Sequence, residues 1–124
     1  MLLHEIIPLI EGSVLTQSSN LARDVKGACG ADLMSDVLAS IKPEALLLTG
    51  LCNPQVVRTA SISDVSAVVF VRGKNPPSET IELAELEDIP LITSQLGMFE
   101  ICGRLYVAGL RSMETSISPE CPCE

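Results

Sequence analysis

A chain of 124 residues in which 47% are apolar and 19% are charged is long enough for one domain with a hydrophobic core. This composition excludes a disordered chain, and the low charged fraction predicts that some apolar surface is buried against a second subunit, as in a homodimer. The net charge of −8, with eight basic residues scattered singly and few aromatic ones, excludes nucleic-acid binding.

Membrane insertion and secretion are also not expected. No apolar stretch approaches the roughly 18 residues of a membrane span. The first residues contain His4 and Glu5 and lack the basic region of a signal peptide. We therefore expect a cytoplasmic protein without a membrane partner.

The first part of the chain predicts short elements. A helix is expected at 2–10, with Pro8 in its first turn or at a break, and strands at 13–16 and 24–30. Asp32 is placed to cap the next helix, which Pro43 ends. The side chains expected to form the core face of that helix are Leu33, Met34, Val37, Leu38 and Ile41.

Two continuous apolar runs, at 45–49 and 67–71, each lead through a glycine turn to a helix start. Continuous runs, as opposed to alternating ones, are typical of strands covered on both faces in a parallel sheet. The first run precedes a helix at 54–62, with Asn53 as N-cap and Pro54 at the first helical position.

The remaining chain repeats this alternation. Ser78 is expected to cap a helix at 79–87, and a third strand follows at 89–93. Ser94 is expected to cap a last helix at about 96–106. The chain is thus predicted to be an α/β three-layer sandwich with a parallel or mostly parallel central sheet of about four to six strands.

Domain organisation follows from the same pattern. We expect a single domain over residues 1–111 and a flexible tail over 112–124, where serine, threonine and proline predominate. The order of the strands is not predicted.

The polar loops after the two buried runs are the candidate site, because α/β sheets bind ligands at the carboxyl ends of their strands. Helix starts supply backbone donors for an anion, and the basic side chains add charge for a phosphate or carboxylate. The alternative is that these loops are ordinary caps and turns. The expected ligand-binding residues are Asp32, Thr49, Gly50, Asn53, Arg72, Gly73 and Lys74.

The chain lacks the usual equipment of an enzyme. Neither a Walker loop nor a dinucleotide-binding fingerprint is present, and His4, the sole histidine, is expected on the surface. No carboxylate pair flanks an evident pocket. We therefore expect no catalytic residue, no metal site and no cofactor.

Five cysteines leave one redox or metal hypothesis open. Cys29 enters a predicted helix and is either a reactive thiol or a small buried residue. Metal or redox function requires Cys29, Cys52 and Cys102 to converge, since no Cys-x-x-Cys pair exists. Cys121-Pro122-Cys123 could chelate a soft metal or pair between subunits, but lies in the expected tail.

Several segments together resemble the DRTGG domain family, and in particular its small stand-alone members, which often occur beside iron-hydrogenase genes. The resemblance covers about Leu2 to Arg111. The segments that carry it are Ala28–Leu38, Leu48–Leu51, Asn53–Val56, Val69–Lys74 and Ile89–Leu91.

The resemblance implies a fold similar to the N-terminal domain of HPr kinase/phosphorylase, and a regulatory, ligand-sensing or dimerising role without catalysis. Relatives occur fused to phosphotransacetylase and between CBS domains. This chain departs from the name-giving motif: 49–53 replaces Gly-Asp-Arg, and Arg72-Gly73-Lys74 replaces Thr-Gly-Gly. The identity of the ligand therefore does not carry over.

The main hypothesis is a non-catalytic regulatory module that binds a small anionic ligand, such as an adenine nucleotide, at the strand ends. The alternative is a protein-interaction or dimerisation module without a ligand, as an accessory to an iron-hydrogenase system.

Overall fold

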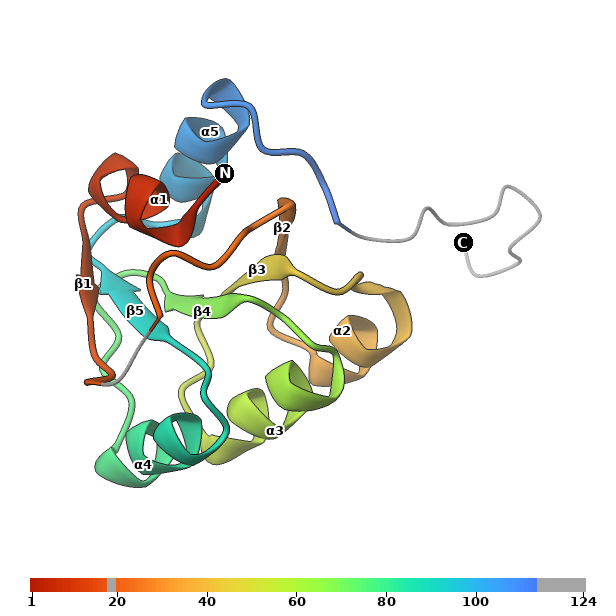
Figure 1. The fold of residues 1–124 in the computed structure, drawn as a ribbon, viewed down its shortest axis with the longest axis vertical. Helices are drawn as coiled ribbons and strands as arrows, with labels where there is room; N and C mark the ends of the chain where they lie inside the picture. The colour runs from red at the N-terminus through yellow and green to blue at the C-terminus, as the bar shows by residue number, and fades with distance from the viewer. Residues whose placement is uncertain (18–19, 114–124) are drawn as a thin grey trace.

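A five-stranded sheet forms the middle of three layers (Figure 1). The computed structural model describes residues 1–17 and 20–113, so most of the expected tail lies outside the described residues. The strand order is β1-β5-β4-β3-β2, in which only β1 is antiparallel to its neighbour. The predicted α/β sandwich is confirmed. Its strands are β1 Gly12–Val14, β2 Gly27–Gly30, β3 Ala45–Thr49, β4 Ala67–Phe70 and β5 Leu91–Ser94.

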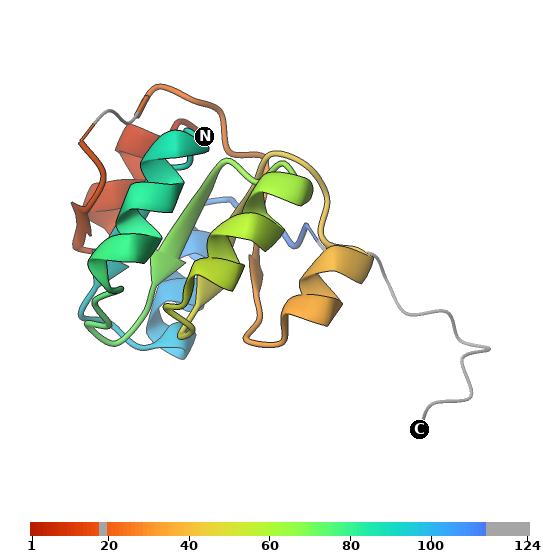
Figure 2. The same ribbon diagram turned by 90° about the horizontal axis from the view of Figure 1, so that it is seen from below.

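Within the described residues, five helices cover the two faces of the sheet. Helices α2 (Met34–Ser40), α3 (Pro54–Ile62) and α4 (Ser78–Leu86) make the three crossovers between parallel strands and lie side by side on one face (Figure 2). Helices α1 (Leu3–Leu9) and α5 (Met98–Val107) lie on the other face. This arrangement buries an apolar cluster on each side of the sheet.

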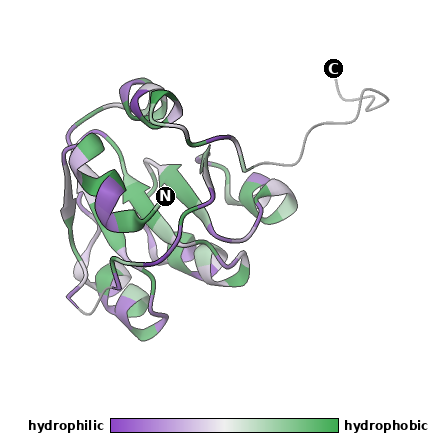
Figure 3. Cartoon of the chain, turned by 45° about the horizontal axis from the view of Figure 1, so that its top comes forward, coloured by the Kyte–Doolittle hydropathy of each residue, from purple (hydrophilic) through white to green (hydrophobic). Residues whose placement is uncertain are grey.

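The two central strands explain the continuous apolar runs in the sequence. Every residue of β3 and β4 is buried, because helices cover both faces of these strands. Side chains alternate along each strand, so Leu46 and Leu48 join the cluster under α1 and α5, whereas Leu47 joins the cluster under α3. The central strands are accordingly hydrophobic in Figure 3.

The outer edge of β2 is covered by the chain after α5. The Ala28 amide donates to the Arg111 carbonyl at 2.9 Å, and the Met113 amide donates to the Ala28 carbonyl at 3.0 Å. Ser112 and Met113, which the sequence assigns to the tail, thus run beside the sheet. Gly27 is required there, because a Cβ would overlap the Met113 side chain and the Arg111 carbonyl.

Three predicted caps are wrong. The N-cap of α2 is Leu33 and not Asp32, and that of α4 is Pro77, so that Ser78 is the first helical residue. The N-cap of α5 is Gly97. The Ser94 hydroxyl instead donates to the Ile10 carbonyl at 2.6 Å, because tertiary contacts offer it a buried acceptor.

Two further expectations need correction. Pro8 lies in the last turn of α1, neither in the first turn nor at a break; the helix ends one residue later. In α2, only Val37 of the predicted stripe is fully buried, whereas Leu33 and Leu38 are 61% and 48% exposed. This short helix lies over the sheet edge, where only one of its sides meets the core.

Candidate functional site

The loops after β3 and β4 lie on the same edge of the sheet, as expected. The two strands are parallel neighbours, and Thr49 is paired with Phe70 at their carboxyl ends. Gly50 and Gly73 therefore follow adjacent strand ends. The loop after β4 leads to α4 on one face, whereas the loop after β5 leads to α5 on the other face.

The backbone amide of Gly50, which follows β3, is already hydrogen-bonded to the carboxylate of Asp32. The Oδ1 atom of this carboxylate accepts the hydroxyl of Thr49 at 3.0 Å and the amide of Gly50 at 2.8 Å. The Thr49 oxygen in turn accepts the Leu51 amide at 3.2 Å. The structure thus brings Asp32, Thr49 and Gly50 together, with a protein carboxylate where an anion was expected.

The loop after β4 is a left-handed turn joined to the loop after β5. Arg72 and Gly73 have φ angles of 59° and 66°. The Arg72 amide donates to the Leu96 carbonyl at 2.8 Å, and the Gly73 amide donates to the Ser94 carbonyl at 2.6 Å. A Cβ on Gly73 would lie 2.7 Å from Oε1 of Gln95, the far end of a flexible side chain that can shift, so the positive φ is what favours glycine at this position.

The basic side chains of this loop remain available to a ligand. Arg72 and Lys74 are exposed, and within the part of the chain that the structure describes neither forms an ion pair. Both project from the loop between β4 and α4. The side chains of Arg72 and Lys74 can therefore contact an anion. The backbone amides of Arg72 and Gly73 cannot, because they donate to carbonyl groups at the end of β5 and in the loop after it.

The start of α3 completes this edge. Asn53 is the N-cap, as predicted, but its exposed side chain makes no capping hydrogen bond. The first residue of α3, Pro54, has no N–H group, and the Val56 amide donates to the Asn53 carbonyl at 3.1 Å, so the start of this helix contributes mainly its partial positive charge. The Cys52 carbonyl accepts the buried Thr80 hydroxyl at 2.8 Å, which ties the start of α3 to α4.

The Cys52 thiol shows that Lys74 acts on this same edge. Burial raises the pKa of Cys52, and the nearby charge of Lys74 partly offsets this rise. Cys52 and Lys74 come from the loops after β3 and β4. The charge of Lys74 is therefore close enough to the loop after β3 to act on Cys52.

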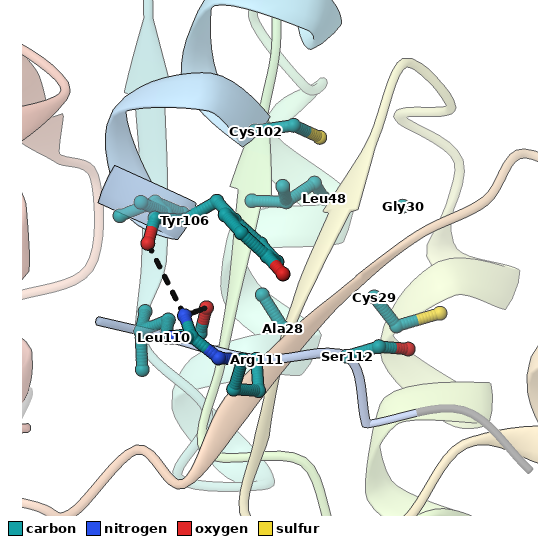
Figure 4. Close-up of a pocket in the computed structure, with 10 residues that line it drawn as sticks. Ala28, Cys29, Gly30, Leu48, Cys102, Tyr106, Leu110, Arg111 and Ser112 are labelled. Carbon is teal, nitrogen blue, oxygen red and sulfur yellow. Dashed lines mark hydrogen bonds between the residues drawn. The ribbon is translucent and has the colours of Figure 1, made fainter. Parts of the chain in front are cut away.

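Sequence reasoning missed a cavity of about 180 Å³ on the α5 side of the sheet (Figure 4). Arg111 stacks over the Tyr106 ring, 4.6 Å from its centroid, and donates to the Tyr106 carbonyl. None of the seven predicted site residues lines this cavity. The cavity is lined by Ala28, Cys29, Gly30, Leu48, Cys102, Leu105, Tyr106, Leu110, Arg111 and Ser112.

The three cysteines of the described chain lie on different elements. Cys29 is buried in β2, Cys52 precedes α3, and Cys102 is on α5. Burial raises the pKa of Cys102. Among the residues described, no group of three or more histidine, cysteine, aspartate or glutamate side chains is arranged to hold a metal ion. His4 lies on the surface, as expected.

Across residues 1–17 and 20–113, no helix has the length and apolar character needed to cross a bilayer.

The fold and this edge define a small α/β domain in which polar and basic loops follow parallel strands. The chain belongs to the DRTGG domain family, whose model matches residues 5–107. The family resemblance drawn from the sequence is confirmed. No curated protein sequence matches the chain.

A solved structure shares the fold. It is that of the CBS and DRTGG domains of the regulatory region of Clostridium perfringens pyrophosphatase, complexed with the activator diadenosine tetraphosphate. The likeness has a TM-score of 0.63 at 17% identity, and covers 91% of this chain and 50% of that one. This chain therefore spans half the length of that solved chain.

Proposed function

We propose that this protein is a non-catalytic ligand-sensing module that binds a small anion, such as an adenine nucleotide, where β3 and β4 end. The observation that carries the proposal is the pair of exposed cations Arg72 and Lys74, which form no ion pair within the described residues and follow the strand next to the one that leads to α3. A phosphate placed between them would meet two charged donors and the partial positive charge of a helix terminus.

The hydrogen-bond pattern refines which predicted residues contact the ligand. We assign direct contact to Arg72, Lys74 and Asn53, because their side chains are exposed and engaged by no described acceptor. Thr49 and Gly73 shape the loops. Asp32 competes with the ligand for the Gly50 amide, so an anion either displaces this carboxylate or binds beside it.

The adenine part of the proposal comes from the relative. The regulatory region of the pyrophosphatase is complexed with an activator that carries two adenosines and four phosphates. That region also contains CBS domains, and this chain corresponds to about half of it.

Titration calorimetry and thermal unfolding in the presence of AMP, ATP and diadenosine tetraphosphate test this function. A ligand present at 100 times its dissociation constant stabilises the folded state by about 2.7 kcal/mol, which raises Tm by several degrees. We expect Lys74→Met and Arg72→Asn to weaken nucleotide binding at least tenfold each. Asparagine is chosen at 72 because it tolerates the left-handed conformation.

Lys42→Met is the matched control. It removes the same charge from an exposed lysine, but Lys42 precedes β3 and so lies at the opposite edge of the sheet. Equal losses in Lys42→Met and Lys74→Met would show that only net charge matters. The absence of binding by any of the three nucleotides, or by inorganic phosphate, would contradict the proposal.

An interaction module is the second candidate, and it rests on a separate observation. Several large apolar side chains are exposed, among them Phe99 at 91% and Val107 at 88%, both on α5. Such exposure is unusual for a chain that acts alone. Light scattering over a range of concentrations separates a monomer from a dimer and thereby tests this candidate.

A further inference from the structure

The cavity between β2, α5 and the segment that follows α5 has no part in the proposed nucleotide site. Its volume is about 180 Å³, and three leucines, Leu48, Leu105 and Leu110, contribute to its walls. An engineered apolar cavity of roughly 150 Å³ binds benzene. The space beside α5 is therefore large enough for the ring or the branched chain of a small ligand.

Two small residues of β2 leave this space open. Ala28 and Gly30 both line the cavity, and since they are two positions apart they face the same side of the sheet. A Cβ on Gly30 would lie 3.1 Å from Sδ of Met98 and 3.9 Å from Sγ of Cys102 on α5. A glycine in a strand often marks a place where a ligand or another backbone comes close. The nearest atoms here belong to side chains, so no second backbone explains this glycine.

A cation and an aromatic ring lie where the cavity opens to solvent. Arg111 and Tyr106 both line the cavity and are exposed (Figure 4). Within residues 1–17 and 20–113, Arg111 forms no ion pair, and only its Nη1 atom donates hydrogen bonds, to the carbonyls of Tyr106 and Leu110. The Nε and Nη2 groups are thus available to an external acceptor.

The position of the guanidinium group is fixed before any ligand arrives. Its central carbon lies 4.6 Å from the centroid of the Tyr106 ring, and the two carbonyls hold one of its nitrogens. A planar guanidinium pairs well with a carboxylate, because its N–H groups match the two carboxylate oxygens. A single cation in a chain of net charge −8 favours a monoanion over a phosphate dianion.

We propose that this cavity binds a small apolar monocarboxylate. Its ring or branched chain lies against Ala28, Gly30 and Leu105, and its carboxylate pairs with Arg111 at the opening. This site is separate from the proposed nucleotide site, because none of the residues assigned to nucleotide contact lines the cavity.

Benzoate and 3-methylbutanoate are the probes that test this site, with binding followed by NMR titration of the backbone amides. We expect each acid to bind with a dissociation constant of about 1 mM or less, and to shift the amides of Ala28 and Cys102. Benzyl alcohol, which has the ring but no charge, should bind at least tenfold more weakly than benzoate. Acetate, which has the charge but only one methyl group, should also bind at least tenfold more weakly.

Two variants separate the charge from the space. Arg111→Met should weaken benzoate binding at least tenfold and leave benzyl alcohol binding unchanged. Ala28→Leu should abolish the binding of both, because the added side chain occupies the cavity. The control is Arg58→Met, which removes the same charge from an exposed arginine on α3, on the other face of the sheet. It should bind benzoate like the wild type. Should Ala28→Leu fail to fold, the comparison of Arg111→Met with Arg58→Met decides the question.

Cys102 supplies a second readout, because it lines the cavity whereas Cys52 does not. At constant pH, benzoate should slow the alkylation of Cys102 at least several-fold and leave Cys52 unchanged. Equal protection of both thiols, or of neither, would overturn the cavity as the binding site.

The two anion sites are distinguished by their own cations. Lys74→Met should leave benzoate binding unchanged. A loss of benzoate affinity in Lys74→Met that is absent from Arg111→Met would place the acid at the strand ends and overturn the cavity proposal. The absence of binding by either acid would also overturn it. A failure of nucleotide binding would leave the result for the cavity untouched.

Discussion

The carboxylate of Asp32 accepts the amide hydrogen of Gly50 across a distance of 2.8 Å. Asp32 follows β2, and Gly50 follows β3, so this contact joins two loops at the carboxyl edge of the sheet. The same oxygen accepts the Thr49 hydroxyl. Asp32 was expected to cap a helix. Its carboxylate is instead bound by Thr49 and Gly50, two of the residues that were predicted to bind an anionic ligand.

Asp32→Ala should loosen this edge and increase its affinity for anions. The exposed carboxylate contributes about 1 kcal/mol to the free energy of unfolding through two charge-assisted hydrogen bonds. Its removal frees the Gly50 amide and eliminates a negative charge, so phosphate and nucleotides should bind more tightly. Urea unfolding and calorimetry measure the two effects.

Asp36→Ala is the matched control for that experiment. Asp36 has the same charge and is exposed on α2, but its carboxylate makes no contact with Thr49 or Gly50. Equal gains in anion affinity for the two variants would show that Asp32 acts through net charge alone.

The buried hydroxyls of Thr59 and Thr80 should respond oppositely to replacement by valine. Among the described residues, no hydrogen-bond partner is found for the Thr59 hydroxyl, whereas that of Thr80 donates to the Cys52 carbonyl. Thr59→Val should stabilise the fold by up to about 1 kcal/mol, because it removes an unsatisfied buried polar group. Thr80→Val should destabilise it by about 1–2 kcal/mol, because it leaves a carbonyl without its donor. Denaturant midpoints that move in the same direction for both variants would contradict this reading.

Gly27→Ala should detach the segment that covers β2. The added methyl group would overlap the Arg111 carbonyl and the Met113 side chain, and the carbonyl cannot move without breaking its bond to the Ala28 amide. We expect a loss of about 2 kcal/mol or more and faster hydrogen exchange at Met113.

Gly97→Ala is the control for the steric argument. A Cβ at Gly97 meets no atom within 4 Å, and its φ of −77° suits any residue. It should change the free energy of unfolding by less than about 0.5 kcal/mol. A comparable loss in both variants would indicate a general intolerance of glycine replacement.

The thiols of Cys52 and Cys102 should react slowly at neutral pH. Burial raises the pKa of both, so the reactive thiolate is scarce until the pH exceeds the usual cysteine range. The alkylation rates of both thiols, followed by mass spectrometry, should rise with pH until the pH exceeds the raised pKa of each thiol. Lys74→Met should slow the alkylation of Cys52, because the lysine charge lowers that pKa, and should leave Cys102 unchanged.

Cys102 therefore serves as the internal reference in that measurement. A rate at Cys52 that does not respond to Lys74→Met would remove the electrostatic link between the loops after β3 and β4. It would also weaken the proposal that these loops form one ligand site.

The sequence was most informative for the central strands. The apolar runs around Leu47 and Val69 could be read as buried parallel strands, because coverage on both faces removes any alternation between polar and apolar residues. The glycine turns after these strands were also predictable, because turn-forming residues act over only a few positions of the chain. From the parallel alignment it followed that Gly50 and Gly73 share an edge, which the pairing of Thr49 with Phe70 bears out.

The partners of individual polar side chains were not predictable. Asp32 and Ser94 both look like helix caps in the sequence, but each bonds to a group distant in the chain: Asp32 to Gly50, and Ser94 to Ile10. A local pattern reports which residues are able to cap, whereas the tertiary structure decides whether a better acceptor or donor lies closer.

By itself, the sequence determined the layered α/β fold, the alternation of strands and helices, and the edge that carries the polar loops. These depend on periodicity and on turn-forming residues, which act over a few positions. Only the tertiary structure decided the strand order, the cavity beside Tyr106 and the exposed face of α5. Those features depend on which distant segments pack together, and the free energy of that packing is shared among many contacts that no single stretch of sequence contains.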